Sequence, residues 1–106
     1  MTDPIVTLEV TAVFQKTKEV DMVVRIGRAA PEGDGWTCLV ELAPVYAQPM
    51  SVRGVDAFHA TWLACSLVLR LLGQLKQEGA ALRSADGSEF PVDAYLAGLG
   101  GDAAGG

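Results

Sequence analysis

The chain is poor in the side chains that most often carry out chemistry. Its 106 residues include one histidine, His59, and two cysteines, Cys38 and Cys65. These three residues make a weak ligand set for zinc, which usually takes four cysteine or histidine ligands at close spacing. Ser66 lies two helical turns from His59, too far for a hydrogen bond between a nucleophile and its base. The sequence therefore predicts no metal, no cofactor and no catalytic residue.

Positive charge is scarce as well. Lysines and arginines number 8 against 13 aspartates and glutamates, which gives a formal net charge of −5. The basic residues are scattered along the chain rather than gathered into a cluster or stripe. Proteins that bind the phosphates of nucleic acids need such a cluster, so we expect no nucleic-acid partner.

Long hydrophobic runs are also missing. The first four residues show no cationic stretch leading into an apolar run, as a secretory signal would. The longest nearly apolar run, residues 62–72, is interrupted by Ser66 and Arg70 and is shorter than the about 20 residues that span a bilayer. We therefore expect no membrane partner. Two cysteines without an export signal are expected to be reduced thiols in a cytoplasmic protein.

The first half of the chain contains instead a clear alternation of apolar and polar residues. Residues 5–14, 19–26 and 36–42 each place their apolar side chains on one face, as half-buried strands do. A polar turn joins the first two strands, and the glycine-rich segment 27–35 is predicted to be a loop. Residues 47–53 are a fourth predicted strand, which Pro49 places at an edge of the sheet or at a bulge.

A leucine-rich helix is predicted over residues 55–78. Asp56 is a good N-cap and Gly79 a good residue to end the helix. The predicted fold class is α+β: a four-stranded antiparallel meander with one long helix packed across one face and a short C-terminal addition. Residues 1–99 are expected to form one domain, and residues 100–106 a flexible tail rich in glycine and alanine.

This helix is apolar over a wider arc than one sheet covers. Its central face is expected to pack on the sheet and contains Phe58, Trp62, Cys65, Val68, Leu69 and Leu72. A second row of apolar residues, here named the flanking stripe, contains Ala60, Leu63, Leu67 and Leu71. We expect the flanking stripe to be covered either by a second copy of the chain or by the C-terminal residues Phe90, Val92, Tyr95 and Leu96.

Two functions from different classes follow from these features. The first is a non-enzymatic protein–protein interaction module that forms a homodimer through the flanking stripe, with an unidentified protein as a further partner. The alternative is a small-ligand binder or minor enzyme with a site at the helix start, formed by Arg53, Asp56 and His59. A concave pocket that collects Arg53 and His59 would favour the alternative.

The two cysteines are predicted to point inward, Cys38 from the third strand and Cys65 from the helix. Buried cysteines usually behave as small apolar side chains, and this is the role we expect for both. The pattern leaves open whether the two thiols touch.

The order of these elements resembles a group of short bacterial proteins that share a domain of unknown function. Trp36-Thr37-Cys38 opens a strand and Gly54-Val55-Asp56-Ala57 opens the helix, as a Trp-x-Cys strand and a Gly-Val-Asp-Ala or -Ser helix start do in that group. The similarity covers residues 5–78. Members of the group usually carry an amide near the position of His59, where this chain departs from them. The resemblance implies no established activity and carries over no catalytic residue.

Overall fold

The alternating residues at the start of the chain form a long antiparallel hairpin. In the computed structural model, which describes residues 4–15 and 17–95, β1 (Pro4–Phe14) pairs with β2 (Lys18–Gly27). Val10 lies opposite Met22, and both side chains are about 1% exposed. Because side chains alternate between the two faces of a strand, the even-numbered residues of both strands share the inner face.

The sheet then grows from the far side of β2. β4 (Gly35–Ala43) pairs with β2, and β5 (Met50–Gly54) pairs with the opposite edge of β4, where Val40 faces both Ile26 and Met50. β5 corresponds to the fourth predicted strand and begins directly after Pro49. Proline has no backbone N–H to donate to a neighbouring strand, so it is expected outside the paired residues or at an edge. All pairings are antiparallel, so the predicted α+β class with an antiparallel sheet is confirmed.

The sheet has six strands, so the prediction of four strands is wrong in number. β3 (Ala30–Glu32) lies within the predicted loop 27–35 and pairs with the start of β4. It is only three residues long and lies at an edge, where Pro31 is tolerated. β6 (Ala81–Ser84) follows the helix and returns to the far edge of the hairpin, with Leu82 opposite Ala12.

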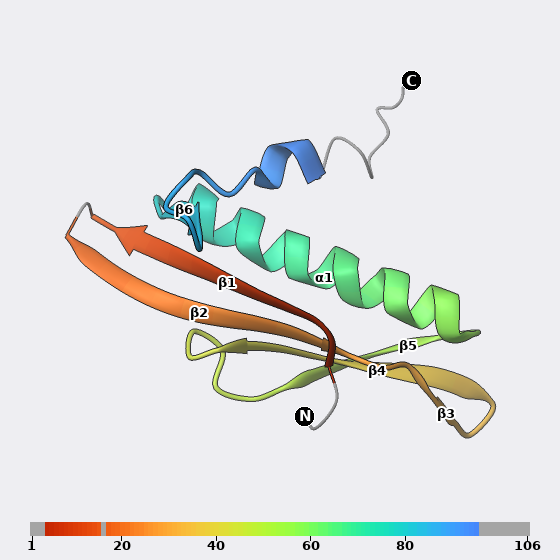
Figure 1. Ribbon diagram of the computed structural model, residues 1–106. Coiled ribbons are helices and arrows are strands. Elements are labelled where there is room, and N and C mark those ends of the chain that lie inside the picture. The colour runs from red at the N-terminus through yellow and green to blue at the C-terminus, as the bar shows by residue number, and fades with distance from the viewer. Residues whose placement is uncertain (1–3, 16, 96–106) are drawn as a thin grey trace.

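The single long helix, α1 (Ala57–Gln77), lies across the inner face of the sheet (Figure 1). Its first turn is capped as predicted, since the Asp56 carboxylate accepts a hydrogen bond of 2.7 Å from the backbone N–H of His59. The chain turns away at Gly79, whose φ of 104° is costly for residues with a Cβ. α1 thus connects β5 at one edge of the sheet with β6 at the other.

The helix is rotated about its axis relative to the prediction. Its sheet-facing residues, all 5% exposed or less, are Ala60, Ala64, Val68, Leu72 and Leu75. Phe58 is 80% exposed and Trp62 is 45% exposed, although both were assigned to the sheet-facing side. Since residues follow one another by about 100° around a helix, the difference is roughly a quarter turn.

The cause of this rotation is the close approach of the helix start to β5. A Cβ placed on Gly54 would lie 2.5 Å from the backbone nitrogen of Ala60. Only small side chains fit at such a contact, and Ala60 and Ala64 provide them. The bulky Phe58 and Trp62 are therefore turned away from the sheet.

The segment after β6 packs beside α1 and completes the core. Phe90 is 6% exposed and Val92 is fully buried. Lys76, in the last turn of α1, donates a 2.8 Å hydrogen bond to the carboxylate of Asp93. Figure 1 shows this segment in blue, running alongside the helix. The predicted tail, residues 100–106, and Leu96 lie outside the described residues.

Candidate functional site

The three residues of the predicted ligand site do not come together. Arg53 lies on the outer face of β5, where its guanidinium forms ion pairs with Asp34 at 2.9 Å and Glu32 at 3.9 Å. α1 lies on the inner face, so Arg53 points away from the helix start. The carboxylate of Asp56 serves as the helix cap, and Nδ1 of His59 accepts a hydrogen bond from the backbone N–H of Val55.

These hydrogen bonds are local to the helix start and give His59 a structural role. Arg53 and His59 lie on opposite faces of the sheet and make separate contacts. The arrangement therefore does not bring them together around one pocket, as the ligand-site alternative requires. No group of three or more potential metal ligands occurs within the described part of the chain.

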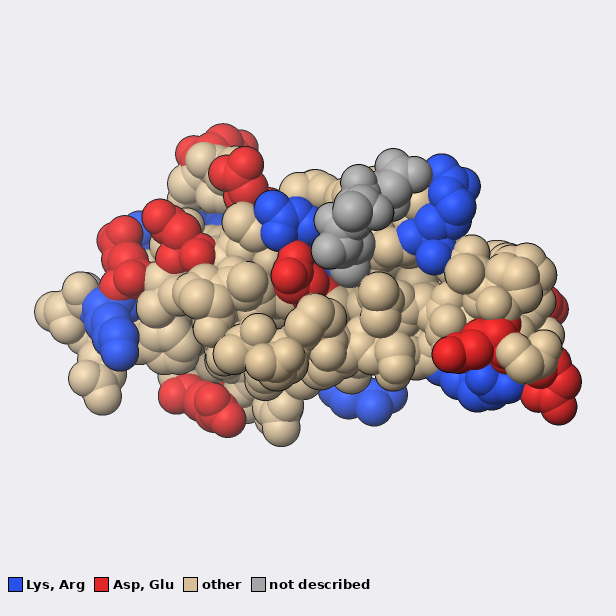
Figure 2. Space-filling model, turned by 90° about the horizontal axis from the view of Figure 1, so that it is seen from below, with Lys and Arg blue, Asp and Glu red and all other residues tan. Residues whose placement is uncertain are grey.

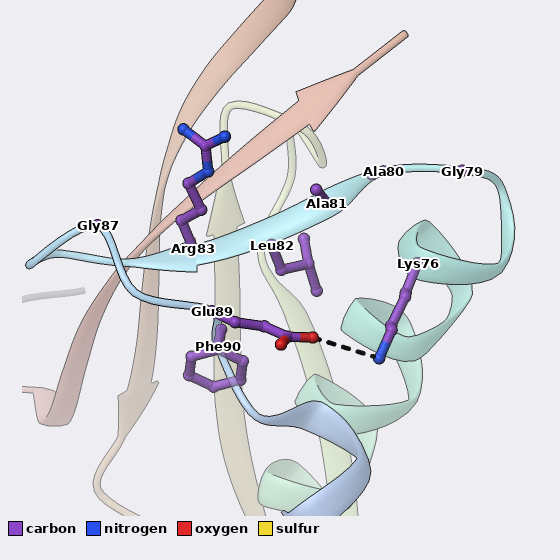
Figure 3. Close-up of a pocket in the computed structure, with 9 residues that line it drawn as sticks. All are labelled: Lys76, Gly79, Ala80, Ala81, Leu82, Arg83, Gly87, Glu89 and Phe90. Carbon is purple, nitrogen blue, oxygen red and sulfur yellow. Dashed lines mark ion pairs between the residues drawn. The ribbon is translucent and has the colours of Figure 1, made fainter. Parts of the chain in front are cut away.

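A hollow of about 480 Å³ lies where the last turn of α1 meets β6 and the segment that follows (Figure 3). Lys76 and Glu89 face each other across it, with 3.9 Å between Nζ and Oε2. The hydrogen bond to Asp93 is the main cause that raises the pKa of Lys76. Figure 3 shows the Arg83 side chain directed away from this ion pair. The charge of Lys76 is thus matched by acids of its own chain, and the lysine ties the C-terminal segment to the helix.

The two thiols lie near each other between β4 and α1. Cys38 is 1% exposed and its Sγ donates a hydrogen bond of 3.2 Å to the carbonyl oxygen of Gly27. Burial raises the pKa of both thiols, and the charge of a Cys65 thiolate would raise the pKa of Cys38 further. Both cysteines are free. A raised pKa disfavours the reactive thiolate, so neither cysteine has the environment of a catalytic nucleophile.

The outer face of the sheet is polar and mixed in charge. Figure 2 shows this face from below, with acidic and basic side chains scattered among uncharged ones. Arg25 and Glu41 form an ion pair of 2.8 Å across β2 and β4, and Thr11 donates a hydrogen bond to Asp21 across β1 and β2. Leu39, 45% exposed, is a large apolar side chain on this face. Scattered apolar residues of this kind are normal on a protein surface.

The most apolar exposed surface of the described residues lies at the start of α1. Val55 is 75% exposed, Phe58 80% and Trp62 45%. Val55 lies just before the helix. Phe58 and Trp62 lie in its first turns, one turn apart, on the side turned away from the sheet. We name these three residues the helix-start surface. Aromatic side chains in adjacent exposed positions are typical of a surface that binds a partner.

A shallow groove continues this surface along the outward side of α1. Its volume is about 490 Å³, and its lining residues are Trp62, Ser66, Leu69, Arg70, Gly73, Gln74 and Gln77. We name it the outward groove. The Ser66 hydroxyl is buried and has no hydrogen-bond partner within residues 4–15 and 17–95. Buried hydroxyls are usually paired, so Ser66 is a polar group that the described residues leave unsatisfied.

The flanking stripe is not the exposed apolar surface of the helix. Ala60, predicted to lie at an interface, is fully buried against the chain's own sheet and offers no exposed surface in this structure. Leu67 and Leu71 are half-buried and pack against the core. Leu63 is half-buried. The fully buried Val92 and the nearly buried Phe90 bring the C-terminal segment into that same core.

By length and composition alone, α1 could also cross a membrane. The run considered in the sequence, residues 62–72, was too short, whereas the helix itself has 21 residues. Helices in protein cores meet the same criterion, and the sheet-facing residues of α1 lie in the core of this protein.

Comparisons of the chain with family models, with curated protein sequences and with solved structures gave no match. The resemblance to a domain of unknown function therefore remains a prediction. One signal in the sequence does bear on the orientation of the helix. Gly54 is followed by small residues at Ala60 and Ala64, a pattern that favours a close helix–sheet contact on that side of the helix.

Proposed function

We propose that this protein is a non-enzymatic protein–protein interaction module that associates with itself through the helix-start surface. The observation that carries the proposal is the exposure of Phe58 and Trp62 on one side of a helix whose other side is already buried. Leaving two such rings in water is unfavourable by about 25 cal/mol per Å² of apolar surface. A covering subunit removes this cost.

The alternative function, ligand binding or catalysis at the helix start, has less support. Arg53 is engaged on the opposite face of the sheet, and Asp56 and His59 satisfy backbone groups of the helix start. Two free thiols of raised pKa suit a reducing compartment, so a cytoplasmic location accompanies the proposal, as does the bacterial origin that the resemblance implies.

The test is the molar mass of the purified protein by size-exclusion chromatography with light scattering. We expect the mass of a dimer for the unmodified chain and of a monomer for Trp62→Glu, with unchanged circular dichroism. Leu39→Glu is the matched control, because Leu39 has the same 45% exposure but lies on the outer face of the sheet. Equal masses for the unmodified chain and Trp62→Glu would reject the proposal.

A further inference from the structure

The outward side of α1 has complementary features at its two ends. The bulky rings of Phe58 and Trp62 project from its first two turns. Gly73, further along, has no side chain, so the helix surface is low in that part of the outward groove. Trp62 and Gly73 are 11 residues apart on the same helix, a distance of about 16 Å along its axis.

We propose that the partner is a second copy of this chain and that the two α1 helices pack antiparallel, with the Trp62 ring of each copy in the Gly73 end of the other copy's outward groove. This inference rests on the proposed self-association and adds the orientation of the two copies and the contact between the Trp62 ring and the Gly73 end of the groove. A two-fold interface must be self-complementary, since each residue pair occurs twice. A projecting ring and a hollow on one helix face meet this condition only when the helices run in opposite directions.

The polar residues of the groove agree with the same arrangement. With the two-fold axis near residue 68, the residue opposite Ser66 is Arg70 of the partner subunit. Arg70 makes no hydrogen bond or ion pair with the described part of its own chain, and the Ser66 hydroxyl lacks a partner there. The Ser66 hydroxyl is buried within its own chain, so the pairing places the guanidinium of Arg70 over the groove surface beside Ser66 and not on its oxygen. The pairing also brings the guanidinium of Arg70 near the partner subunit's Trp62, where a cation–π contact is favourable.

The available area is sufficient for a specific dimer. A stable interface buries at least about 1,000 Å² in total, or about 500 Å² on each copy. At exposures of 80% and 45%, Phe58 and Trp62 together offer roughly 250 Å² on each copy, because such rings bury about 150–250 Å² each. Val55, Leu69 and the walls of the outward groove supply the rest along a helix of 21 residues.

Charge along the groove favours this partner as well. The lining residues include one cation, Arg70, and no acid. Two copies that pack antiparallel offset the two Arg70 side chains along the axis instead of stacking them. The two helix dipoles also run antiparallel, so the positive end of each helix lies beside the negative end of the other.

The test is site-directed cross-linking of single-cysteine variants in a background of Cys38→Ala and Cys65→Ala. His59→Cys and Gln77→Cys both lie on the outward side and leave Trp62, Ser66, Arg70 and Gly73 unchanged. The antiparallel arrangement brings residue 59 of one copy near residue 77 of the other. In the same arrangement, residue 59 of one copy lies about 25 Å from residue 59 of the other, and the same holds for residue 77. A short bis-maleimide should therefore link a co-expressed mixture of the two variants and neither variant alone.

Other outcomes separate the two proposals. Cross-linking of His59→Cys or Gln77→Cys with itself means parallel helices and overturns the inference. A dimeric mass without any cross-link places the interface elsewhere and also overturns it, while self-association stands. A monomeric mass for the unmodified chain rejects both.

A second variant tests the hollow independently. Gly73→Leu removes a glycine from the helix interior, which favours the helix itself, and fills the outward groove. The expected result is a monomer that is folded and unfolds at a higher temperature than a monomeric Trp62→Glu reference. A dimer of unchanged mass would contradict the role of the hollow.

Discussion

Gly54 and Ala60 bring the end of β5 and the first turns of α1 into backbone contact. A Cβ on Gly54 would lie 2.5 Å from the Ala60 nitrogen and 2.9 Å from its Cα. Both residues are buried, and Gly54 leaves no room for a Cβ. This one contact sets which side of the helix faces the sheet and therefore which side carries Phe58 and Trp62 into solvent.

Gly54→Ala should destabilise the fold. The added methyl group meets backbone atoms, which cannot move aside as a flexible side chain can, so the helix start must shift. Overpacking of this kind costs about 1–3 kcal/mol in free energy of unfolding, measurable by urea denaturation. The matched control is Gly35→Ala, where the methyl group meets only the side chain of Arg53, at 3.0 Å. A loss for Gly35→Ala as large as that for Gly54→Ala would contradict the explanation.

This contact also marks the limit of what could be predicted from the sequence. Alternation in residues 5–14 and 19–26 was enough to place the inner faces of β1 and β2, because one face of a strand must be apolar throughout. The cap at Asp56 followed from local chemistry. The side of α1 that faces the sheet could not be predicted in this way, because a helix that is apolar on most sides shows no single face for burial. Side-chain size at Ala60 and Ala64 decided it.

The missed strand and the separation of the predicted site residues have similar local causes. β3 has three residues, too few to show a period, and Pro31 among glycines is typical of a loop. Arg53, Asp56 and His59 are close in sequence, but a strand end and a helix start lie between them. Alternation along residues 50–54 already places Arg53 on the face opposite Val52 and so away from the helix.

The two cysteines should differ in their reaction with iodoacetamide at pH 8. Cys65 is half-buried, whereas Cys38 is 1% exposed, and burial raises the pKa of both thiols above their ordinary value of 9.0. We expect slow alkylation of Cys65 and no alkylation of Cys38 until the protein unfolds. Mass spectrometry of tryptic peptides measures both rates. In urea the two rates should become similar, and equal rates in the native protein would contradict the packing of Cys38.

The link between Lys76 and the C-terminal segment should weaken at high pH. The Asp93 carboxylate holds the pKa of Lys76 above its ordinary value of 10.5. A group with a raised pKa in the folded state adds stability below its unfolded pKa and loses it as the pH rises through the folded pKa. The difference in melting temperature between the unmodified chain and Lys76→Met should therefore be small but constant up to about pH 10 and shrink above it.

Lys76→Arg is the control for this experiment, because an arginine keeps its charge at pH 11. The melting temperature of Lys76→Arg should therefore stay above that of Lys76→Met at high pH, where the difference between the unmodified chain and Lys76→Met shrinks. A lysine advantage that did not change between pH 8 and pH 11 would mean that Lys76 stabilises the segment through its aliphatic chain rather than its charge.

Glutamate substitutions along α1 should separate its core-facing residues from its exposed ones. Leu67 and Leu71 are half-buried and pack against the core, so Leu67→Glu and Leu71→Glu should each lower the free energy of unfolding by about 1–3 kcal/mol. Phe58→Glu replaces a side chain that is 80% exposed and should leave the monomer fold intact. Denaturation at a protein concentration low enough to keep every variant monomeric isolates folding from association. If Leu71→Glu proved harmless and Phe58→Glu unfolded the chain, α1 would have to face the sheet as its hydrophobic pattern alone suggested.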